Sequence, residues 1–279
     1  MKKYLLLAMA LLILGGCSPK EENLKVISFN VRVCLNDTSD GSNNWKYRKE
    51  AAVKMIQTEN PDFFGLQEAL YKQAKYMEEN LPEYTKYGVD RDGGFEKGEA
   101  ESCAIFFRKD KYKLIDKGTF WLSETPETPS RGWDAMCHRV VTWVHLRQKG
   151  LGGEDIFFMN THFDHRGVEA RINSSHLLME KVKEIVPEDA ILLITGDFNA
   201  KIEDEALAPI VKGLEYSRET SPVSDSTTTF NNWGRVKKAN IIDHIFYKNV
   251  TPLKYRTVTE DYGAPYISDH YPIVFEGKL

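Results

Sequence analysis

The sequence predicts an α/β domain in which two mixed β-sheets pack face to face and helices cover the outside. Beyond a short leader, about 260 residues, in a chain with 42% apolar content, can bury one large core. Short apolar runs rich in β-branched and aromatic residues recur along the chain, and helical patterns separate them without strict alternation. In one run Val144 and Leu146 share an apolar face. Residues 191–194 are instead apolar on both faces and belong deep in a sheet.

Strands are expected where β-branched and aromatic residues gather in such runs. The expected strands are residues 24–30, 62–67, 102–108, 140–147, 155–161, 190–196, 241–247 and 271–276. Helices are expected at residues 45–58, where the apolar positions share one face, and at residues 71–80. The longest helix is expected at residues 167–186, because Leu178 and Val182 begin a four-residue recurrence that Pro187 ends.

The first 17 residues form a leader rather than part of the fold. Lys2 and Lys3 precede an apolar stretch, and two glycines lead to Cys17, as in a secretory signal. The sequence before Cys17 resembles a bacterial lipobox, in which the cysteine is lipidated, and residues 18–23 follow as a polar tether. We therefore expect residues 24–279 to form one domain outside the cytoplasm, held on a bacterial membrane by lipid alone. A plain signal peptide and a buried N-terminal helix are the alternatives.

Charge and cysteine content narrow the class of protein. Loss of Lys2 and Lys3 moves the formal charge from −4 to −6, and no run of Lys or Arg stands out. A protein whose main task is to bind nucleic-acid backbone is usually basic, so tight non-specific DNA binding is not expected. Cys34, Cys103 and Cys137 lack a zinc-binding spacing, and we expect no structural disulfide. A monomer is expected.

Polar residues follow or close the apolar runs at five separated points. These points are residues 28–32, 66–68, 160–162, 196–199 and 268–270. The ends of strands on a packed sheet are where a rigid scaffold presents functional groups. Acids, amides and histidines in such a place suit a hard divalent cation and a phosphate ester. The pattern predicts a hydrolase.

These motifs, in this order, resemble the endonuclease/exonuclease/phosphatase superfamily, which includes pancreatic deoxyribonuclease, poly(A) deadenylases, sphingomyelinases and inositol polyphosphate 5-phosphatases. The Gly-Asp-Phe-Asn motif ending at Asn199 and the Ser-Asp-His motif ending at His270 are the most specific. The resemblance spans residues 30–270, essentially the whole domain. It implies a four-layer α/β sandwich around two mixed sheets.

The resemblance also implies a metal site and an acid that acts on water. Glu68 matches the family's metal-binding glutamate, Asn30 lies beside it, and Asp269 completes the metal shell from the opposite side. Carboxylate and amide oxygens suit Mg²⁺, with Mn²⁺ or Ca²⁺ also open. Asp197 matches the residue that activates or orients the attacking water, and Asn199 the residue that orients Asp197 and contacts the phosphate. Without the other motifs, this last segment would be an ordinary Asx turn.

Two histidines flank the scissile phosphate in the family, and His162 and His270 match them. Each can donate a hydrogen bond to phosphoryl oxygens as negative charge develops. The family orients each histidine with a carboxylate. Asp243 matches the partner of His270, and Glu101 matches the partner of His162, with nearby Glu99 as an alternative register.

Substrate contacts are expected from basic residues and from one loop. Arg139 opens a strand where relatives carry a basic residue facing the phosphate, and Arg can form a bidentate contact. Arg32 and Arg166 are further substrate-side candidates. The turn-rich loop over residues 120–134 offers Trp133 as a wall of the binding cleft, with a packed surface loop as the alternative.

The expected function is a divalent-metal-dependent phosphoesterase in which a water oriented by Asp197 attacks phosphorus in line. Negative charge and export favour a small-molecule, lipid or sugar phosphate ester as the substrate. A secreted nuclease acting on DNA or RNA is the alternative. A non-catalytic binding lipoprotein is a third possibility, which would predict loss of some of the matched residues.

Overall fold

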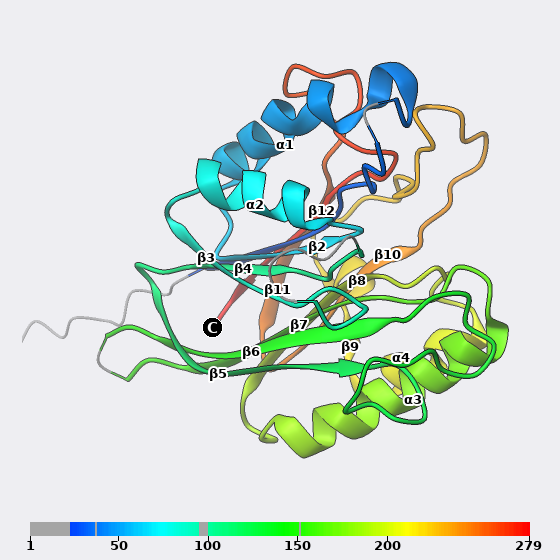
Figure 1. Cartoon of the computed structure of the whole chain (residues 1–279). Coiled ribbons are helices and arrows are strands. Elements are labelled where there is room, and N and C mark those ends of the chain that lie inside the picture. The colour runs from blue at the N-terminus through cyan, green and yellow to red at the C-terminus, as the bar shows by residue number, and fades with distance from the viewer. Residues whose placement is uncertain (1–22, 37, 95–99, 151) are drawn as a thin grey trace, which may run out of the picture.

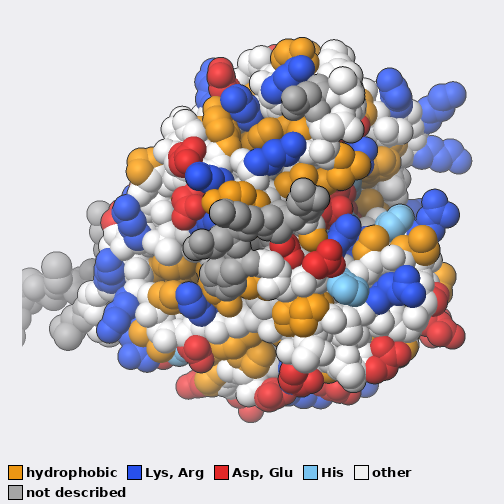
Figure 2. All heavy atoms as spheres, viewed as in Figure 1, with side chains coloured by type: hydrophobic (Ala, Val, Ile, Leu, Met, Phe, Trp, Pro, Cys, Tyr) orange, Lys and Arg blue, Asp and Glu red, His pale blue; other side chains and the backbone are white. Residues whose placement is uncertain are grey.

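A computed structural model describes residues 23–36, 38–94, 100–150 and 152–279. Two six-stranded mixed sheets pack face to face between two layers of helices (Figure 1). Helices α1 (Trp45–Glu59) and α2 (Tyr71–Asn80) cover one sheet, and α3 (Val168–Ile185) and α4 (Ala208–Gly213) cover the other. The predicted four-layer α/β sandwich is confirmed. On the face seen in Figure 2, acidic and basic side chains are interspersed.

The strand order is β11-β12-β1-β2-β4-β3 in the first sheet and β5-β6-β7-β8-β10-β9 in the second. The strands of the first sheet are β1 (Asn23–Asn30), β2 (Phe63–Gln67), β3 (Tyr84–Tyr87), β4 (Ile105–Arg108), β11 (Thr251–Thr257) and β12 (Ile273–Lys278). Those of the second are β5 (Tyr112–Trp121), β6 (Val140–Gln148), β7 (Asp155–His162), β8 (Ile191–Asp197), β9 (Glu215–Tyr216) and β10 (Asp243–Lys248). Short helical turns are η1 (Gly41–Asn43), η2 (Glu205–Leu207) and α5 (Ser217–Thr220).

Each sheet contains one parallel pair, and each pair is a β-α-β unit. Helix α1 joins β1 to β2, and α3 joins β7 to β8. Such a crossover brings the carboxyl ends of its two strands to the same edge of the sheet. Strands β1 and β2 therefore end side by side at Asn30 and Gln67, and β7 and β8 end side by side at His162 and Asp197.

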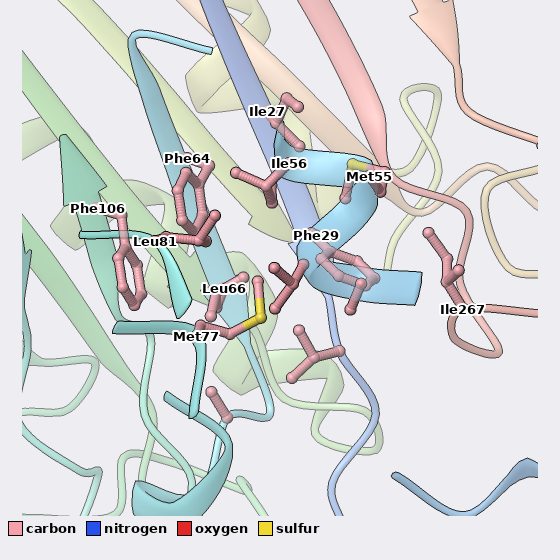
Figure 3. Close-up of a cluster of buried hydrophobic side chains, with 14 of the residues drawn as sticks. Ile27, Phe29, Met55, Ile56, Phe64, Leu66, Met77, Leu81, Phe106 and Ile267 are labelled. Carbon is pink, nitrogen blue, oxygen red and sulfur yellow. The ribbon is translucent and has the colours of Figure 1, made fainter. Parts of the chain in front are cut away.

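Three hydrophobic layers hold the sandwich together. Between the two sheets, a buried cluster includes Phe63 of β2 and Phe158 of β7. Figure 3 shows part of the layer between the first sheet and its helices, where Ile56 of α1 lies among side chains that include Phe64. Leu178 of α3 belongs to the third cluster, which packs on the second sheet. Each fully buried side chain of this size contributes roughly 1.5–3 kcal/mol, so these layers fix the strand ends rigidly.

All the expected strands form, but the sequence patterns miss β3, β5, β9 and β11. These four are the edge strands of the two sheets. An edge strand pairs on one side only and has little need of apolar residues on both faces. The burial of β5 illustrates this, because Lys113, Asp116 and Lys117 within it are exposed.

Some expected boundaries are shifted. The tether was expected to include Asn23, but Asn23 pairs with Lys278 and starts β1, because β12 provides a hydrogen-bonding partner for it. Strand β4 starts at Ile105, and Ser102 before it forms only isolated bridges. The last strand starts at Ile273.

The expected leader, its lipid-bearing Cys17 and the tether up to residue 22 lie outside the described residues. Within the described residues, no helix combines the length and apolar content needed to cross a bilayer. Among the described residues, Cys34, Cys103 and Cys137 have free thiols.

Candidate active site

The polar residues singled out in the sequence converge at the edge where both parallel pairs end. Asn30 is the last residue of β1, and Glu68 directly follows β2. In the second sheet, His162 and Asp197 end β7 and β8 as register partners. Asp243, the first residue of β10, pairs with Asp197. Residues far apart in sequence therefore lie close together, because the two β-α-β crossovers and the antiparallel pairing of β10 with β8 bring the strand ends together.

The side chain of Asn30 links the two sheets at this edge. Its Nδ2 donates to Oε1 of Glu68 (3.1 Å) and to Oδ2 of Asp197 (2.9 Å). The backbone N–H of Asn199 donates to the other oxygen of Asp197 (3.0 Å), in a tight turn where Asn199 has a φ of 48°. Both carboxylate oxygens of Asp197 are thus held. The sequence alone left open whether this segment is an ordinary Asx turn or part of a site. In the structure the Asx turn is what holds Asp197 in the candidate site.

Asp197 is buried among other acids. Burial, together with the carboxylates of Asp243 and Glu68, raises the pKa of Asp197 to about 7. Burial and the charge of Glu68 also raise the pKa of Asp269. Crowded carboxylates of this kind are costly to ionise without a nearby cation.

The two histidines lie near Asp197 in opposite charge states. Although burial opposes its charge, the carboxylates of Asp243 and Asp197 raise the pKa of His270 to about 10. Burial and nearby positive charges hold the pKa of His162 well below its usual value. Neutral His162 accepts a hydrogen bond from Nδ2 of Asn199 at its Nε2 (3.0 Å). Oδ2 of Asp197 lies 3.5 Å from Nε2 of His162 and 3.7 Å from Nε2 of His270.

The donor atoms of this site fit a divalent cation. Ligand atoms of Glu68, His162 and Asp197 lie within 4.8 Å of one another. The amide nitrogen of Asn30 donates to two of these residues, and its amide oxygen, expected as a metal ligand, instead accepts the backbone N–H of Arg32 (2.9 Å). Asp269 and Glu68 both lie within 4.0 Å of the Arg32 guanidinium. Carboxylate oxygens are ligands that hard divalent cations prefer, and a cation would relieve the repulsion between the buried acids.

Arg32, expected on the substrate side, lines the cavity described below and also lies beside the acids of the candidate metal site. Its guanidinium pairs with Asp40 (3.2 Å) and lies 3.7 Å from Asp269 and 4.0 Å from Glu68. Although burial opposes the charge, these acids raise the pKa of Arg32. Arg32 therefore remains a cation beside the carboxylates that would hold the metal.

A cavity of about 660 Å³ opens over these residues. Besides the catalytic candidates, its lining includes Arg91, Glu101, Arg139, His165, Phe230, Asn232, Trp233, Arg235 and Asn240. The buried acids and histidines and a wall beyond them thus belong to one space, in which part of a small molecule can be enclosed.

Arg139 is buried, lines the cavity and is held in place by two partners. Its Nε donates to Oδ2 of Asp164 (3.3 Å), and its Nη2 donates to Nδ1 of His165 (3.0 Å). Although burial opposes ionisation, backbone N–H groups of Gly167 and Arg166 and the charge of Arg139 lower the pKa of Asp164 to about 2. A guanidinium fixed in this way is suited to a phosphate group. Asp164 was not among the residues expected from sequence.

Glu101 does not have the contact expected of it. It lines the cavity, but its carboxylate accepts a hydrogen bond from Nη1 of Arg91 (2.9 Å). Among the described residues, no hydrogen bond joins Glu101 to His162; the hydrogen-bond partner of this carboxylate is Arg91. The alternative, Glu99, lies outside the described residues.

Arg166 and Trp133 do not line the cavity, contrary to expectation. The carboxylate of Asp164 accepts the backbone N–H of Arg166 and turns the chain into α3, which leaves the Arg166 side chain exposed. Trp133 is half-buried in a turn with a φ of 49°, and its backbone N–H faces Glu124. The loop that carries Trp133 packs on itself instead of forming the cavity wall.

The sequence reasoning missed the segment over residues 230–235, which supplies the wall that Trp133 was expected to supply. Phe230, Asn232, Trp233 and Arg235 all line the cavity. The available signal was the run Asn-Asn-Trp-Gly, in which turn-forming residues surround a large aromatic residue.

The sequence profile of the Endonuclease/Exonuclease/phosphatase family matches residues 27–270. A solved structure of a mannosyl-6-phosphatase from Bacteroides thetaiotaomicron is 36% identical, covers 92% of this chain and 100% of that chain, and has a TM-score of 0.85. A family protein from the same organism is 36% identical over 93% of this chain and 99% of its own, with a TM-score of 0.86. An uncharacterized protein of Acanthamoeba polyphaga mimivirus is 27% identical over 90% of this chain and 98% of that protein. The sequence match and the likeness of the fold both identify the present chain with this family, in agreement with its polar strand ends. The chain therefore belongs to the Endonuclease/Exonuclease/phosphatase family and is a phosphoester hydrolase.

Proposed function

We propose that this protein is a metal-dependent phosphatase that acts on a small phosphate ester, with sugar phosphates as the substrate class. The observation that carries the proposal is the cavity, which encloses the buried acids and histidines at one end and has an aromatic and polar wall beyond them. A space of about 660 Å³ suits a compact ester better than a long strand. The likeness to a mannosyl-6-phosphatase supports the same class.

Asp197 and His270 have different roles in the proposed hydrolysis. Asp197, held by Asn30 and Asn199, orients a water molecule in line with the phosphorus–oxygen bond to be broken. His270, charged through Asp243, donates a hydrogen bond to a phosphoryl oxygen as negative charge develops there.

A divalent cation, with Mg²⁺ the first choice, would be held by the carboxylates of Glu68 and Asp269, and it would neutralise charge on the phosphate. Asn30 would hold Glu68 in place for it, because the amide nitrogen of Asn30 faces Glu68 (3.1 Å) and its amide oxygen accepts the backbone N–H of Arg32 (2.9 Å). Arg139 binds the phosphate from the cavity side, fixed by its buried carboxylate partner.

The test is hydrolysis by the purified chain with Mg²⁺, and with EDTA, of mannose 6-phosphate, glucose 6-phosphate, bis-p-nitrophenyl phosphate, single-stranded DNA and RNA. An Asp197→Asn variant should lose activity by about a thousandfold or more. Asp155→Asn is the matched control, because Asp155 starts β7 at the far end from the site. Metal-dependent release of phosphate from the sugar esters supports the proposal. Cleavage of DNA or RNA alone would replace it with a nuclease.

We also propose that the chain is anchored outside the cytoplasm through Cys17. The support is the leader sequence, in which a basic start and an apolar stretch precede a cysteine and a polar tether. A Cys17→Ala variant should move from the membrane fraction to the soluble fraction. Unchanged membrane association of that variant would contradict the anchor.

A further inference from the structure

We propose that Trp233 is the residue that binds the sugar part of the substrate, an inference that rests on the proposed function. In the proposed function the buried acids, the histidines and Arg139 all act at the phosphate group. The rest of the ester must therefore be bound elsewhere in the cavity. Trp233 lines that cavity and is only half-buried. It offers a large, flat, apolar surface beside polar side chains.

The backbone around Trp233 is held in a disfavoured conformation. Asn232, Trp233 and Gly234 have φ values of 47°, 57° and 76° in succession. A left-handed backbone is unfavourable for a bulky residue and persists only where the surroundings impose it, often at ligand-binding positions. At Gly234 a side chain would be strained by the left-handed backbone and would displace Tyr266, because a Cβ atom there would lie 2.0 Å from the hydroxyl oxygen of Tyr266.

Hydrogen bonds fasten this segment to the catalytic residues. The backbone N–H groups of Asn231 and Asn232 donate to the carbonyl of Asp269 (2.8 and 3.0 Å). The side chain of Asn231 donates to the carbonyl of Ser268 (3.1 Å) and accepts the backbone N–H of Trp233 (2.8 Å). Trp233 therefore has a fixed position relative to the residues that address the phosphate.

A buried cation supports the Trp233 ring. The guanidinium of Arg48 lies 5.5 Å from the ring centre, and Arg48 is itself anchored to the carbonyls of Ile267 (3.0 Å) and Arg32 (2.9 Å). A cation on one face of an indole holds the ring in place and leaves the opposite face for a ligand.

The surroundings of Trp233 favour a sugar over a nucleobase. Asn232, Arg235 and Asn240 line the same wall and carry the amide and guanidinium groups that hydrogen-bond hydroxyls. Phe230, the other aromatic residue of this wall, packs its ring against His270 at a centroid distance of 5.0 Å. One aromatic face beside several polar groups matches a pyranose, which has an apolar C–H face and hydroxyls at its edge. A flipped base is instead read between two stacking groups.

The test compares the wild-type chain with Trp233→Ala, Trp233→Phe and Trp133→Ala on mannose 6-phosphate, glycerol 1-phosphate and AMP. Trp133 is the matched control because it is also a half-buried, left-handed tryptophan, but lies outside the cavity. Trp233→Ala should raise KM for mannose 6-phosphate about 30-fold with kcat within about threefold, and Trp233→Phe about fivefold. Glycerol 1-phosphate, too small to reach the ring, should change less than about threefold. Thermal unfolding confirms that each variant folds.

Each contrary result has a distinct meaning. Equal losses on mannose 6-phosphate and glycerol 1-phosphate would show that Trp233 only positions the catalytic residues, and unchanged kinetics in Trp233→Ala would also overturn the inference. A wild-type preference for AMP that Trp233→Ala abolishes would make the ligand a base and overturn the sugar assignment. No hydrolysis of any of the three esters by the wild type would overturn the proposed function itself, and the inference with it.

Discussion

Asp243 and His270 form a buried ion pair that joins the two sheets at the catalytic edge, with Oδ2 of Asp243 2.9 Å from Nδ1 of His270. Asp243 starts β10 in the second sheet, whereas His270 precedes β12 in the first. Packing of the two sheets, and not the sequence separation of the two residues, therefore sets the charge of this histidine. The pair makes the catalytic proposal directly testable.

Asp243→Asn should lower kcat by about a hundredfold or more, because the amide no longer favours the charged form of His270. The measurement is steady-state hydrolysis of the best ester at saturating Mg²⁺. The binding of Mn²⁺, followed by calorimetry, should change little, since Asp243 is bonded to His270 and not to the proposed metal ligands. Activity within about threefold of wild type would contradict the assigned role.

Arg48→Lys should weaken metal binding more than it weakens the fold. Arg48 is buried and donates to the carbonyls of Arg32 and Ile267, so one guanidinium sets the spacing between the segment that carries Asn30 and the segment that carries the proposed metal ligand Asp269. A lysine has a single nitrogen and cannot span them. Calorimetric Kd values for Mn²⁺ should rise about tenfold.

The matched control for this substitution is Arg218→Lys. Arg218 also donates to backbone carbonyls, at Asp225 (2.8 Å) and Thr227 (3.2 Å), but it lines a different cavity. The Arg218→Lys substitution should lower the melting temperature without changing the Kd for Mn²⁺. Equal metal affinity in both variants would show that Arg48 serves the fold alone.

Asp164→Asn should raise KM for phosphate esters by about tenfold, because Arg139 loses the carboxylate that holds its guanidinium. Inorganic phosphate should also inhibit the variant more weakly, which separates loss of phosphate binding from loss of chemistry. The competitive inhibition constant for phosphate is the measurement to make. An unchanged constant with a reduced kcat would mean that Arg139 acts on the transition state without anchoring the ground state.

His244 should make the protein less stable as the pH falls below neutrality. Its Nε2 donates to the carbonyl of Ala200 (2.9 Å) and its Nδ1 accepts from the hydroxyl of Tyr216 (3.1 Å), so the neutral ring fits its buried place. Burial lowers the pKa of His244 to about 4, against roughly 6.5 when unfolded. The unfolded chain therefore takes up the proton first, and stability is lost as the pH falls from about 6.5 toward 4.

The measurement is urea unfolding of the wild type and of His244→Gln at pH 7.5 and pH 5. We expect the free energy of unfolding of the wild type to fall by about 2 kcal/mol more than that of the variant between these two pH values. The variant itself is expected to be less stable at pH 7.5, where it lacks the ring. Parallel pH dependence in the two proteins would show that His244 does not titrate in this range.

The central strands and the residues that lie at their ends are predictable from the sequence because their patterns are local. Residues 191–194 are apolar on both faces, which places β8 deep in a sheet, and Asp197 at the end of that strand follows directly. The edge strands are not predictable in this way. The pairing of β5 with β6 depends on backbone hydrogen bonds to one neighbour, which the side chains of β5 do not reveal.

By itself, the sequence determined the fold class, the family resemblance and most of the buried acids, amides and histidines of the site, since each follows from a short pattern around a buried strand. Only the tertiary structure decided which side chains meet. In the structure Glu101 accepts a hydrogen bond from Arg91, Trp133 lies outside the cavity, and Trp233 lines it. These outcomes depend on loop paths and on the packing of one sheet against the other, and no local pattern contains that information.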